Sequence, residues 1–300
     1  MNERIEQIKI YIGKHFRLFK TEKGWKILIF AAIISFLVSF VLQGTMFVDT
    51  LNTQMGFFTL VSACIWIGIF NSIQSICKER DIIKREHRTG LHISSYVISH
   101  MIYQALICIV ETLILLGISA FLLKYPTDKA LVISVYIEYF ITFFLITYAA
   151  DILALAISAI VRSTTTAMTV MPFILIIQLL FAGVIFPLEG PMETVAKFTI
   201  SKWGLNATSI SCDYNNLENF QMRETRWQLK QIAKSKKAPL TDKQVEELVE
   251  EAYSDVDYTI ADYEYSTLNL FKQWGIFILH ILAYGAICIL FLEFIDKDKR

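Results

Sequence analysis

The densest set of ionisable side chains in this sequence lies between two strongly apolar runs. The stretch KERDIIKREHRTGLHISSYVISH, residues 78–100, mixes basic and acidic residues and then has a single glycine. Mixed charges suit a surface that docks on a complementary partner, because paired charges set register and specificity. An idle basic loop on the inner side of a membrane has a similar composition. The stretch includes Glu79, Arg80, Arg85, Glu86, Arg88 and Gly90.

The other reactive side chains indicate neither catalysis nor metal binding. A phosphate-binding loop needs the pattern GxxxxGK[ST], and the Gly13-Lys14 pair is followed by histidine. His87, His92 and His100 lack the spacing of a zinc site and an acidic or thiol partner. We therefore expect no enzyme activity, metal or cofactor on this chain.

Three carboxylates fall inside apolar runs: Glu111, Glu138 and Asp151. An ionisable group inside a membrane is costly and is a functional-site hypothesis by default. A proton-coupled carrier would need such groups. The alternative is that they pair between helices or lie near a membrane face.

Long apolar runs dominate the chain, which has 300 residues, 55% of them hydrophobic, and a mean hydropathy of +0.49. About 18 apolar residues are enough to cross a bilayer. Six runs meet or approach that length: 27–41, 57–76, 97–123, 130–160, 167–186 and 274–294. We predict an all-α membrane protein with six transmembrane helices, five within 24–187 and the sixth at 273–294.

Basic residues are distributed unevenly among the connecting segments. Sixteen lie in the N-terminal segment, the second and fourth loops and the tail 295–300, against two in the short first and third loops. The positive-inside rule therefore predicts that both termini are cytoplasmic. The isoleucine- and lysine-rich composition is typical of a bacterial protein. Together with the apolar runs, it predicts a multi-pass protein of a bacterial cell membrane.

Two polar segments flank the apolar runs. Residues 1–23 have apolar side chains at helical spacing opposite a basic face, which predicts an amphipathic helix on the inner membrane surface or a solvated leader helix. Residues 188–272 are too polar to span and predict a helical outer segment. LENFQMRETRWQLKQI and TDKQVEELVEEAY have helical patterns there, with Thr241 as a candidate N-cap.

Two blocks of the sequence resemble ABC-2-type permeases of the G subfamily, above all bacterial permease domains fused to ATPase and forkhead-associated domains. The matching residues of the first block are Asn71, Ile76, Lys78, Glu79, Arg80, Arg85, Glu86, Gly90, Leu91, Tyr96 and Ser99. The matching residues of the second block are Ser158, Ala159, Arg162, Ala167, Met168, Pro172, Gln178, Leu179, Leu180, Phe181, Gly183, Phe186, Pro187 and Trp203.

The resemblance implies a role for the charged stretch. In this family the first intracellular loop, here residues 78–96, is a short coupling helix that docks on an ATPase and carries its closure into the membrane. The resemblance therefore implies that the docking residues are Glu79, Arg80, Arg85, Glu86, Arg88 and Gly90. Glu86 is then expected to bond neighbouring backbone or an arginine of the N-terminal helix. Gly90 would permit the turn into the third span, and Tyr96 would lie at headgroup level.

The resemblance also implies a substrate path. Its expected lining residues are Cys64, Trp66, Ile67 and Asn71 on the second span, with Gln178 and Phe181 closing its outer end. The residues alone leave alternatives. Asn71 could make a helix-packing hydrogen bond, and the interruption at Gly183 and Pro187 could be a simple helix terminus.

We therefore predict the permease subunit of an ATP-binding cassette exporter for a hydrophobic or amphipathic substrate: a drug, a lipid or a peptide. Relatives carry the ATPase upstream on the same chain, and here about two dozen residues precede the first span. The expected partners are a separate ATPase chain that holds ATP and Mg, a second permease copy or paralogue and the bilayer, with no nucleic acid. The alternatives are a peptide-sensing or immunity membrane protein and a proton-coupled secondary carrier.

Overall fold

The computed structural model describes residues 2–126, 130–234, 241–253 and 258–294, and every regular element within them is a helix. The predicted all-α class is confirmed. The longer helices are α1 (Asn2–Thr21), α2 (Trp25–Leu42), α3 (Thr50–Ser72), α4 (Ser75–Arg88), α5 (Ile93–Leu122), α6 (Val135–Ile160), α7 (Thr164–Leu180) and α12 (Thr267–Glu293). Between α7 and α12 lie α8 (Pro191–Ala196), α9 (Ile200–Ser211), η1 (Tyr214–Asn216), α10 (Phe220–Lys234), α11 (Asp242–Tyr253) and η2 (Ala261–Tyr263).

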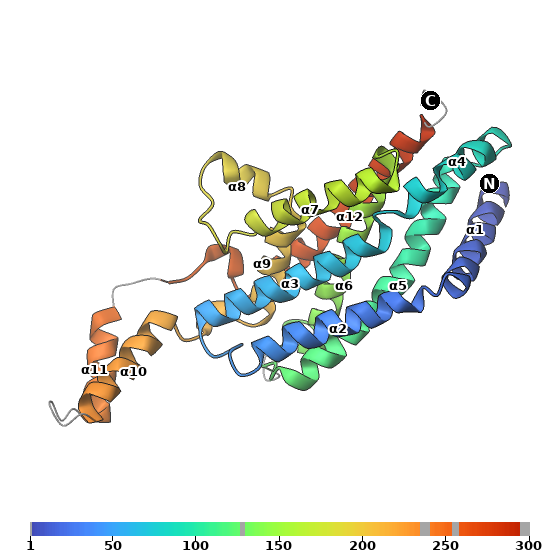
Figure 1. Cartoon of the computed structure of the whole chain (residues 1–300). Coiled ribbons are helices and arrows are strands. Elements are labelled where there is room, and N and C mark those ends of the chain that lie inside the picture. The colour runs from blue at the N-terminus through green and yellow to red at the C-terminus, as the bar shows by residue number, and fades with distance from the viewer. Residues whose placement is uncertain (1, 127–129, 235–240, 254–257, 295–300) are drawn as a thin grey trace.

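Five helices of the described part are long and apolar enough to cross a membrane, namely α2, α3 with α4, α5, α6 and α12. The remaining predicted run forms α7, an apolar helix of 17 residues. The chain starts α2 and finishes α12 at the same end of the bundle (Figure 1), so it passes along the bundle an even number of times. α7 supplies the remaining passage. It is only about 25 Å long at 1.5 Å per residue, so six full spans stay a prediction.

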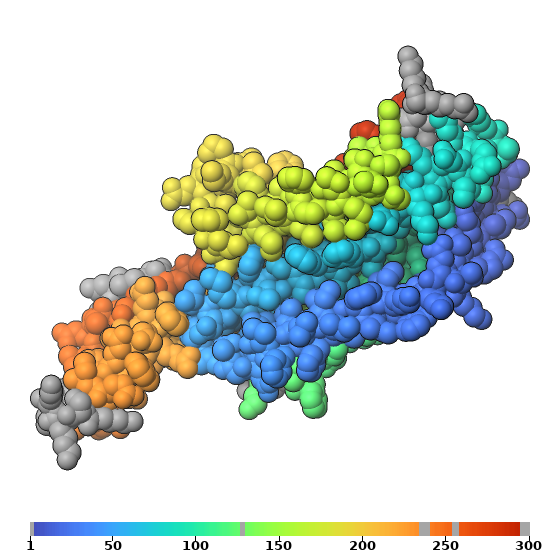
Figure 2. Space-filling model, viewed as in Figure 1, coloured from blue at the N-terminus to red at the C-terminus, as the bar shows by residue number. Residues whose placement is uncertain are grey.

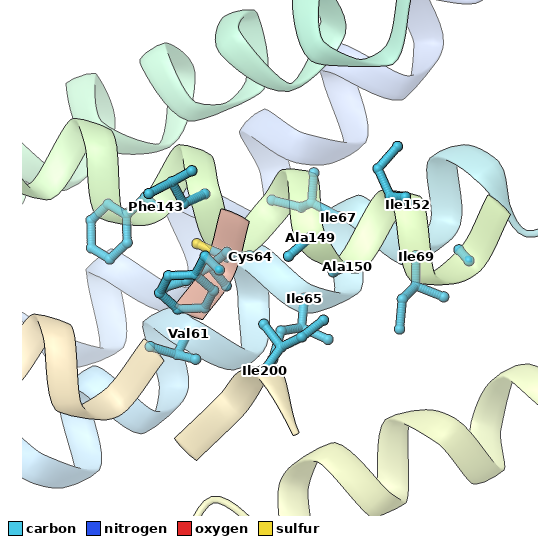
Figure 3. Close-up of a cluster of buried hydrophobic side chains, with 14 of the residues drawn as sticks. Val61, Cys64, Ile65, Ile67, Ile69, Phe143, Ala149, Ala150, Ile152 and Ile200 are labelled. Atoms are coloured by element: carbon cyan, nitrogen blue, oxygen red, sulfur yellow. The ribbon is translucent and has the colours of Figure 1, made fainter. Parts of the chain in front are cut away.

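The core of the bundle is the contact between α3 and α6. Figure 3 shows side chains of α3 meeting those of α6, with Ile200 of α9 beside them. The approach is close because Gly68 has no side chain: a Cβ there would lie 2.2 Å from the carbonyl oxygen of Thr147. Small residues at a helix interface let the two backbones approach in this way. The labelled core residues are Val61, Cys64, Ile65, Ile67, Ile69, Phe143, Ala149, Ala150, Ile152 and Ile200.

The segment between α7 and α12 divides into two parts. α9 is buried among α3, α6 and α12, so this part of the predicted outer segment lies inside the bundle. Gln178 caps it, because its Oε1 accepts the backbone N–H groups of Ile200 and Ser201 at 2.9 and 3.2 Å. An amide oxygen satisfies the donors that a helix N-terminus leaves unpaired.

The second part is a hairpin of α10 and α11 that extends beyond the bundle, at the end opposite α1 and α4 (Figure 2). Both predicted helices are confirmed. The predicted N-cap of α11 is also confirmed, since Thr241 Oγ1 accepts from the N–H of Gln244 at 3.4 Å and donates to its Oε1 at 3.0 Å.

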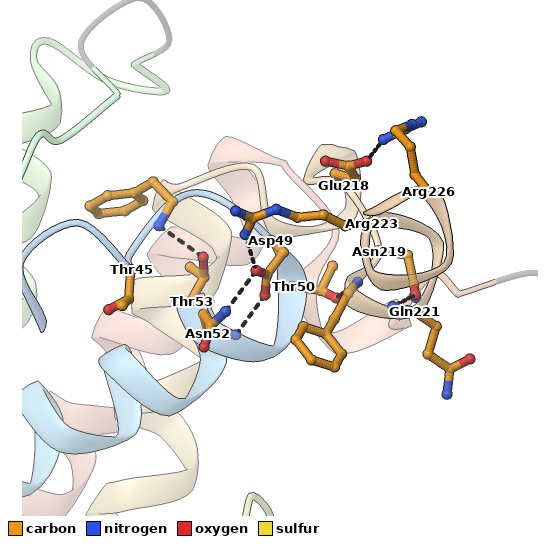
Figure 4. Close-up of polar contacts among 12 residues, drawn as sticks. Thr45, Asp49, Thr50, Asn52, Thr53, Glu218, Asn219, Gln221, Arg223 and Arg226 are labelled. Atoms are coloured by element: carbon orange, nitrogen blue, oxygen red, sulfur yellow. Dashed lines mark hydrogen bonds and ion pairs between the residues drawn. The ribbon is translucent and has the colours of Figure 1, made fainter. Parts of the chain in front are cut away.

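The hairpin joins the bundle at the start of α3 (Figure 4). The fully buried Asp49 carboxylate accepts the backbone N–H of Asn52 at 2.8 Å and the Nη1 of Arg223 at 2.7 Å. Arg226 of α10 pairs with Glu218. A buried carboxylate needs such donors, so Arg223 fixes the first turn of α10 to α3.

Candidate functional site: the junction around α4

The charged stretch folds as α4, which follows α3 after a short break and turns at its end into α5. The N–H groups of Thr89 and Leu91 both bond the carbonyl of Glu86, at 3.1 and 3.0 Å. Gly90 has φ +107°, a value that L side chains rarely adopt. The expected turn at Gly90 is therefore present, and its geometry favours glycine. We call the contacts of α4 with α1, α5 and α6 the coupling junction.

Two carboxylates of α4 face α1 and α5. Glu79 Oε2 accepts from Lys14 Nζ at 3.2 Å and from the Tyr96 hydroxyl at 3.3 Å. Glu86 Oε2 accepts from the Tyr11 hydroxyl at 2.7 Å. The sequence predicted backbone or an arginine as the partner of Glu86, and the structure corrects this to a tyrosine. α1 is therefore held against α4 by an ion pair and a charge-assisted hydrogen bond.

α6 holds the other side of α4. Arg80 Nη1 donates to the carbonyls of Ala159 and Val161 at 2.8 and 3.1 Å. These carbonyls are at the end of α6, where a helix leaves acceptors unpaired and favours a positive charge. Ser158 Oγ accepts the buried backbone N–H of Ile76 at 3.1 Å. Arg80 and Ser158 together fix the start of α4 to the end of α6.

The remaining predicted docking residues lie on the outer face of α4. Arg85 and Arg88 are exposed, as is Asp81. Ile82 is 39% exposed on the same helix, and sequence reasoning missed it. The spacing of Ile82 and Arg85 could have revealed it, because residues three apart in a helix lie on the same face. α4 thus has an inner face that binds the fold and an outer face with both charges and an apolar side chain.

Aromatic and imidazole rings fill the space between α1 and α5. The ring centroids of His15 and His100 are 3.9 Å apart. His100 Nε2 contacts the Tyr96 hydroxyl at 3.1 Å, and His15 Nε2 lies 3.5 Å from Ser99 Oγ. Tyr96 is fully buried, so its ring packs inside the protein, and its expected place at headgroup level stays a prediction.

Two groups of α1 at this contact have shifted pKa values. Burial lowers the pKa of His15 to about 4, and the Lys14 charge adds to the effect. Burial also raises the pKa of the Tyr11 hydroxyl, and the Glu86 carboxylate raises it further. Both shifts follow from the cost of charging a desolvated group. At neutral pH the two rings are uncharged, which suits their packing against α5.

A cavity of about 390 Å³ lies beside the coupling junction, between α1, the start of α2, the end of α3, and α5. Its lining has apolar side chains, such as Phe19, Ile27 and Ile107. The lining also has polar side chains, such as Glu79 and Gln104. A cavity with both kinds of side chain has the chemistry to hold an amphipathic molecule.

The predicted path residues of α3 point to different sides of that helix. Cys64 and Ile67 are buried against α6 (Figure 3). Trp66 is 40% exposed and Phe70, which sequence reasoning missed, is 47% exposed. On α7, Gln178 caps α9 and Phe181 is half-buried at the helix end. Their roles in a path stay predictions.

The carboxylates of the apolar runs are buried and partly bonded. Glu111 accepts from Asn71 Nδ2 at 2.7 Å, which is the helix-packing bond considered for that asparagine. Asp151 accepts from Cys108 Sγ at 3.4 Å, and Glu138 accepts the backbone N–H of Val132 at 2.7 Å. Each carboxylate keeps one oxygen with no hydrogen-bond partner in the described part of the chain.

Comparison with known proteins now decides the family. Residues 6–210 match the family described as ABC-2 type transporter. The chain belongs to the ABC-2 transporter family. The match covers α1 to α9, so it includes the coupling junction and the buried α9, while α10 to α12 lie beyond it. This ABC-2 protein is therefore a multi-pass membrane subunit of a transporter.

A relative from Mycobacterium tuberculosis is described as an ABC transporter ATP-binding/permease protein. It is 27% identical to this chain over 152 residues, which are 50% of this chain and 18% of the relative. The chain thus matches less than a fifth of that protein's length. The finer resemblance to permeases fused to forkhead-associated domains stays a prediction.

Proposed function

We propose that this ABC-2 protein is the permease subunit of an exporter that moves a hydrophobic or amphipathic substrate, driven by ATP hydrolysed on a separate chain. The two faces of α4 carry the proposal. Its inner face is fixed to α1, α5 and α6, and its outer face presents Asp81, Ile82 and Arg85. A helix held on three sides transmits a displacement to the bundle, whereas a free loop would absorb it.

The partner permease is proposed to lie against the exposed face of α3. Trp66 and Phe70 are one helical turn apart on that face, and Met55 extends the stripe toward the other end of the helix. Two such subunits would enclose a path between them. The second subunit is proposed to be an identical copy or a related chain, with both termini of each on the ATPase side.

The docking surface is tested by purifying the protein from its native membrane in mild detergent. We expect a P-loop ATPase to copurify. The double variant Ile82→Asp, Arg85→Glu should lose it, because both side chains are exposed and the change reverses the charge of the outer face. Lys243→Glu on α11 is the matched control, since it reverses an exposed charge in the hairpin. Copurification unaffected by the double variant would remove α4 as the docking site.

The substrate class is tested with permease and ATPase reconstituted together. Hydrophobic or amphipathic drugs, lipids and peptides should stimulate ATP hydrolysis, and the stimulation should disappear in the α4 double variant. A panel that leaves hydrolysis unchanged would contradict export of such substrates.

A proton-coupled carrier is the second candidate, and the buried Glu111, Glu138 and Asp151 favour it. A carrier of this kind would stop when a protonophore is added while ATP stays high. Activity that survives both the protonophore and the triple variant Glu111→Gln, Glu138→Gln, Asp151→Asn would eliminate it.

A further inference from the structure

A second cavity, of about 530 Å³, lies away from the coupling junction, toward the other end of α12. We call it the α8–α12 cleft, because α8, α9, η2 and the first turns of α12 enclose it. Its lining residues are Glu193, Lys197, Lys202, Trp203, Ala261, Asp262, Glu264, Ser266, Leu268, Asn269, Lys272 and Gln273. None of the roles derived above uses it.

The cleft has equal numbers of positive and negative groups, three lysines and three carboxylates. Lys197 Nζ pairs with Glu193 Oε1 at 3.5 Å, whereas the other four groups are poorly matched to one another. Lys202 Nζ is 4.0 Å from Asp262, which is beyond hydrogen-bonding distance. Lys272 and Glu264 have no ion-pair partner in the described part of the chain. The cleft therefore offers both a cation and an anion to a ligand.

Lys202 is the most constrained of these groups. Its side chain is only 13% exposed, and its Nζ lies 6.0 Å from the centre of the Trp203 ring. The indole N–H donates to the carbonyl of Lys197 at 2.8 Å, which fixes the ring. A nearly buried ammonium is costly unless anions or oxygen acceptors surround it. Gln273 adds an unmet acceptor, since it is 2% exposed and its Oε1 has no partner among the described residues.

Exposed apolar side chains line the cleft or neighbour its lining residues in the chain, and we call them the apolar collar. Leu268 lines the cleft and is 81% exposed, and Phe198, next to Lys197, is 73% exposed. Val195 of α8 is 45% exposed between two lining residues. In a membrane protein such a collar meets hydrocarbon. The combination of balanced charge and apolar collar fits a molecule that has a zwitterionic head and lipid tails.

We propose that the α8–α12 cleft binds the headgroup of a zwitterionic membrane phospholipid. Lys202 and Lys272 take the phosphate, and Asp262 and Glu264 take the ammonium with the face of Trp203. An anionic headgroup would leave the two carboxylates without a cation. A free headgroup would leave the apolar collar uncovered. The site requires neither ATP nor transport, so it stands apart from the proposed export.

The test is native mass spectrometry of the full chain with equal amounts of phosphatidylethanolamine, phosphatidylcholine and phosphatidylglycerol. We expect one zwitterionic lipid per chain to be retained about tenfold over phosphatidylglycerol. Asp262→Asn with Glu264→Gln should invert this preference, because Lys202 and Lys272 then remain without acidic partners, while Lys197 keeps Glu193. Glu247→Gln with Glu250→Gln on α11 is the matched control and should leave the preference unchanged.

Lys202→Gln should lower retention of the zwitterionic lipids about tenfold. Lys272→Gln should lower retention of these lipids too. Lys272 is exposed, so this variant tests the site even if the Lys202 variant does not fold. Equal retention of the three lipids, or a preference that the carboxylate variants do not change, would overturn the proposal. Soluble glycerophosphoethanolamine that binds as well as the lipid would also overturn it, because the ligand would then be a free headgroup.

Discussion

At the residue scale, Gly68 sets how closely α3 approaches α6. A Cβ at this position would lie 2.2 Å from the carbonyl oxygen of Thr147 and 3.0 Å from the backbone nitrogen of Asp151. Backbone atoms cannot move aside unless the two helices separate. We expect Gly68→Ala to lower the free energy of unfolding by about 3 kcal/mol, as overpacking does in a filled core. Thermal unfolding in detergent measures the change.

Gly117→Ala on α5 is the control for that variant. A Cβ at Gly117 meets nothing within 4 Å, so alanine should be tolerated or slightly stabilising in the helix. Equal thermal midpoints for the two alanine variants would show that the close approach at Gly68 does not limit stability.

His15 gives the α1–α5 contact a pH dependence. Its pKa is lowered to about 4 in the folded protein, so the unfolded chain binds more protons between that value and the ordinary pKa of 6.5. The stability it contributes is therefore full above pH 6.5 and is lost as the pH falls toward 4. The loss is at most about 3 kcal/mol.

The measurement is the thermal midpoint between pH 7 and 4.5 for the wild type and for His15→Phe. The midpoint of the wild type should fall more steeply, because phenylalanine fills a similar space and does not titrate. Parallel pH profiles would mean that protonation of His15 has no part in holding α1.

At the element scale, the α10–α11 hairpin is a separable unit. Val245 and Val249 of α11 are fully buried. The two helices α10 and α11 meet the bundle mainly at the start of α3. Replacing Thr225–Tyr253 by a Gly/Ser linker keeps Arg223 on Asp49. It also keeps Tyr263, which is 5% exposed in the bundle core. We expect the shortened protein to retain its thermal midpoint within a few degrees.

The same variant separates two of the functional alternatives. A transporter should keep ATP-coupled turnover without the hairpin, because the coupling junction and α7 are untouched. A peptide sensor that binds its ligand through the hairpin would lose all response. Thr225→Ala, which removes only the hydroxyl contact with Tyr253, is the mild control.

At the scale of the whole molecule, the orientation in the membrane is open to direct test. The five native cysteines are all buried, so they give a low background for thiol labelling. We expect Lys243→Cys on α11 to react with a membrane-impermeant maleimide in intact cells. Arg85→Cys on α4 should react only after lysis. The reverse pattern would place the termini outside and would remove α4 from any contact with a cytoplasmic ATPase.

Contiguous features were determined by the sequence alone. Periodicity, hydropathy and local backbone freedom are properties of residues that are neighbours in the chain, so they can be read from the sequence. They predicted the apolar runs, the amphipathic N-terminal helix, α10, α11 and the turn at Gly90. The charged residues of α4 also lie on one short segment, and the family resemblance alone gave them a docking role. The helical pattern gave Thr241 its role as an N-cap, because capping acts within one helical turn.

Only the tertiary structure decided which polar groups meet. Tyr11 and Glu86 are 75 positions apart, and Gln178 caps a helix that begins 22 residues later. Nothing in the local pattern distinguishes a surface tyrosine from the buried Tyr96, or a polar outer helix from α9. These outcomes depend on how the helices pack, because a buried donor takes whichever acceptor the fold brings within reach.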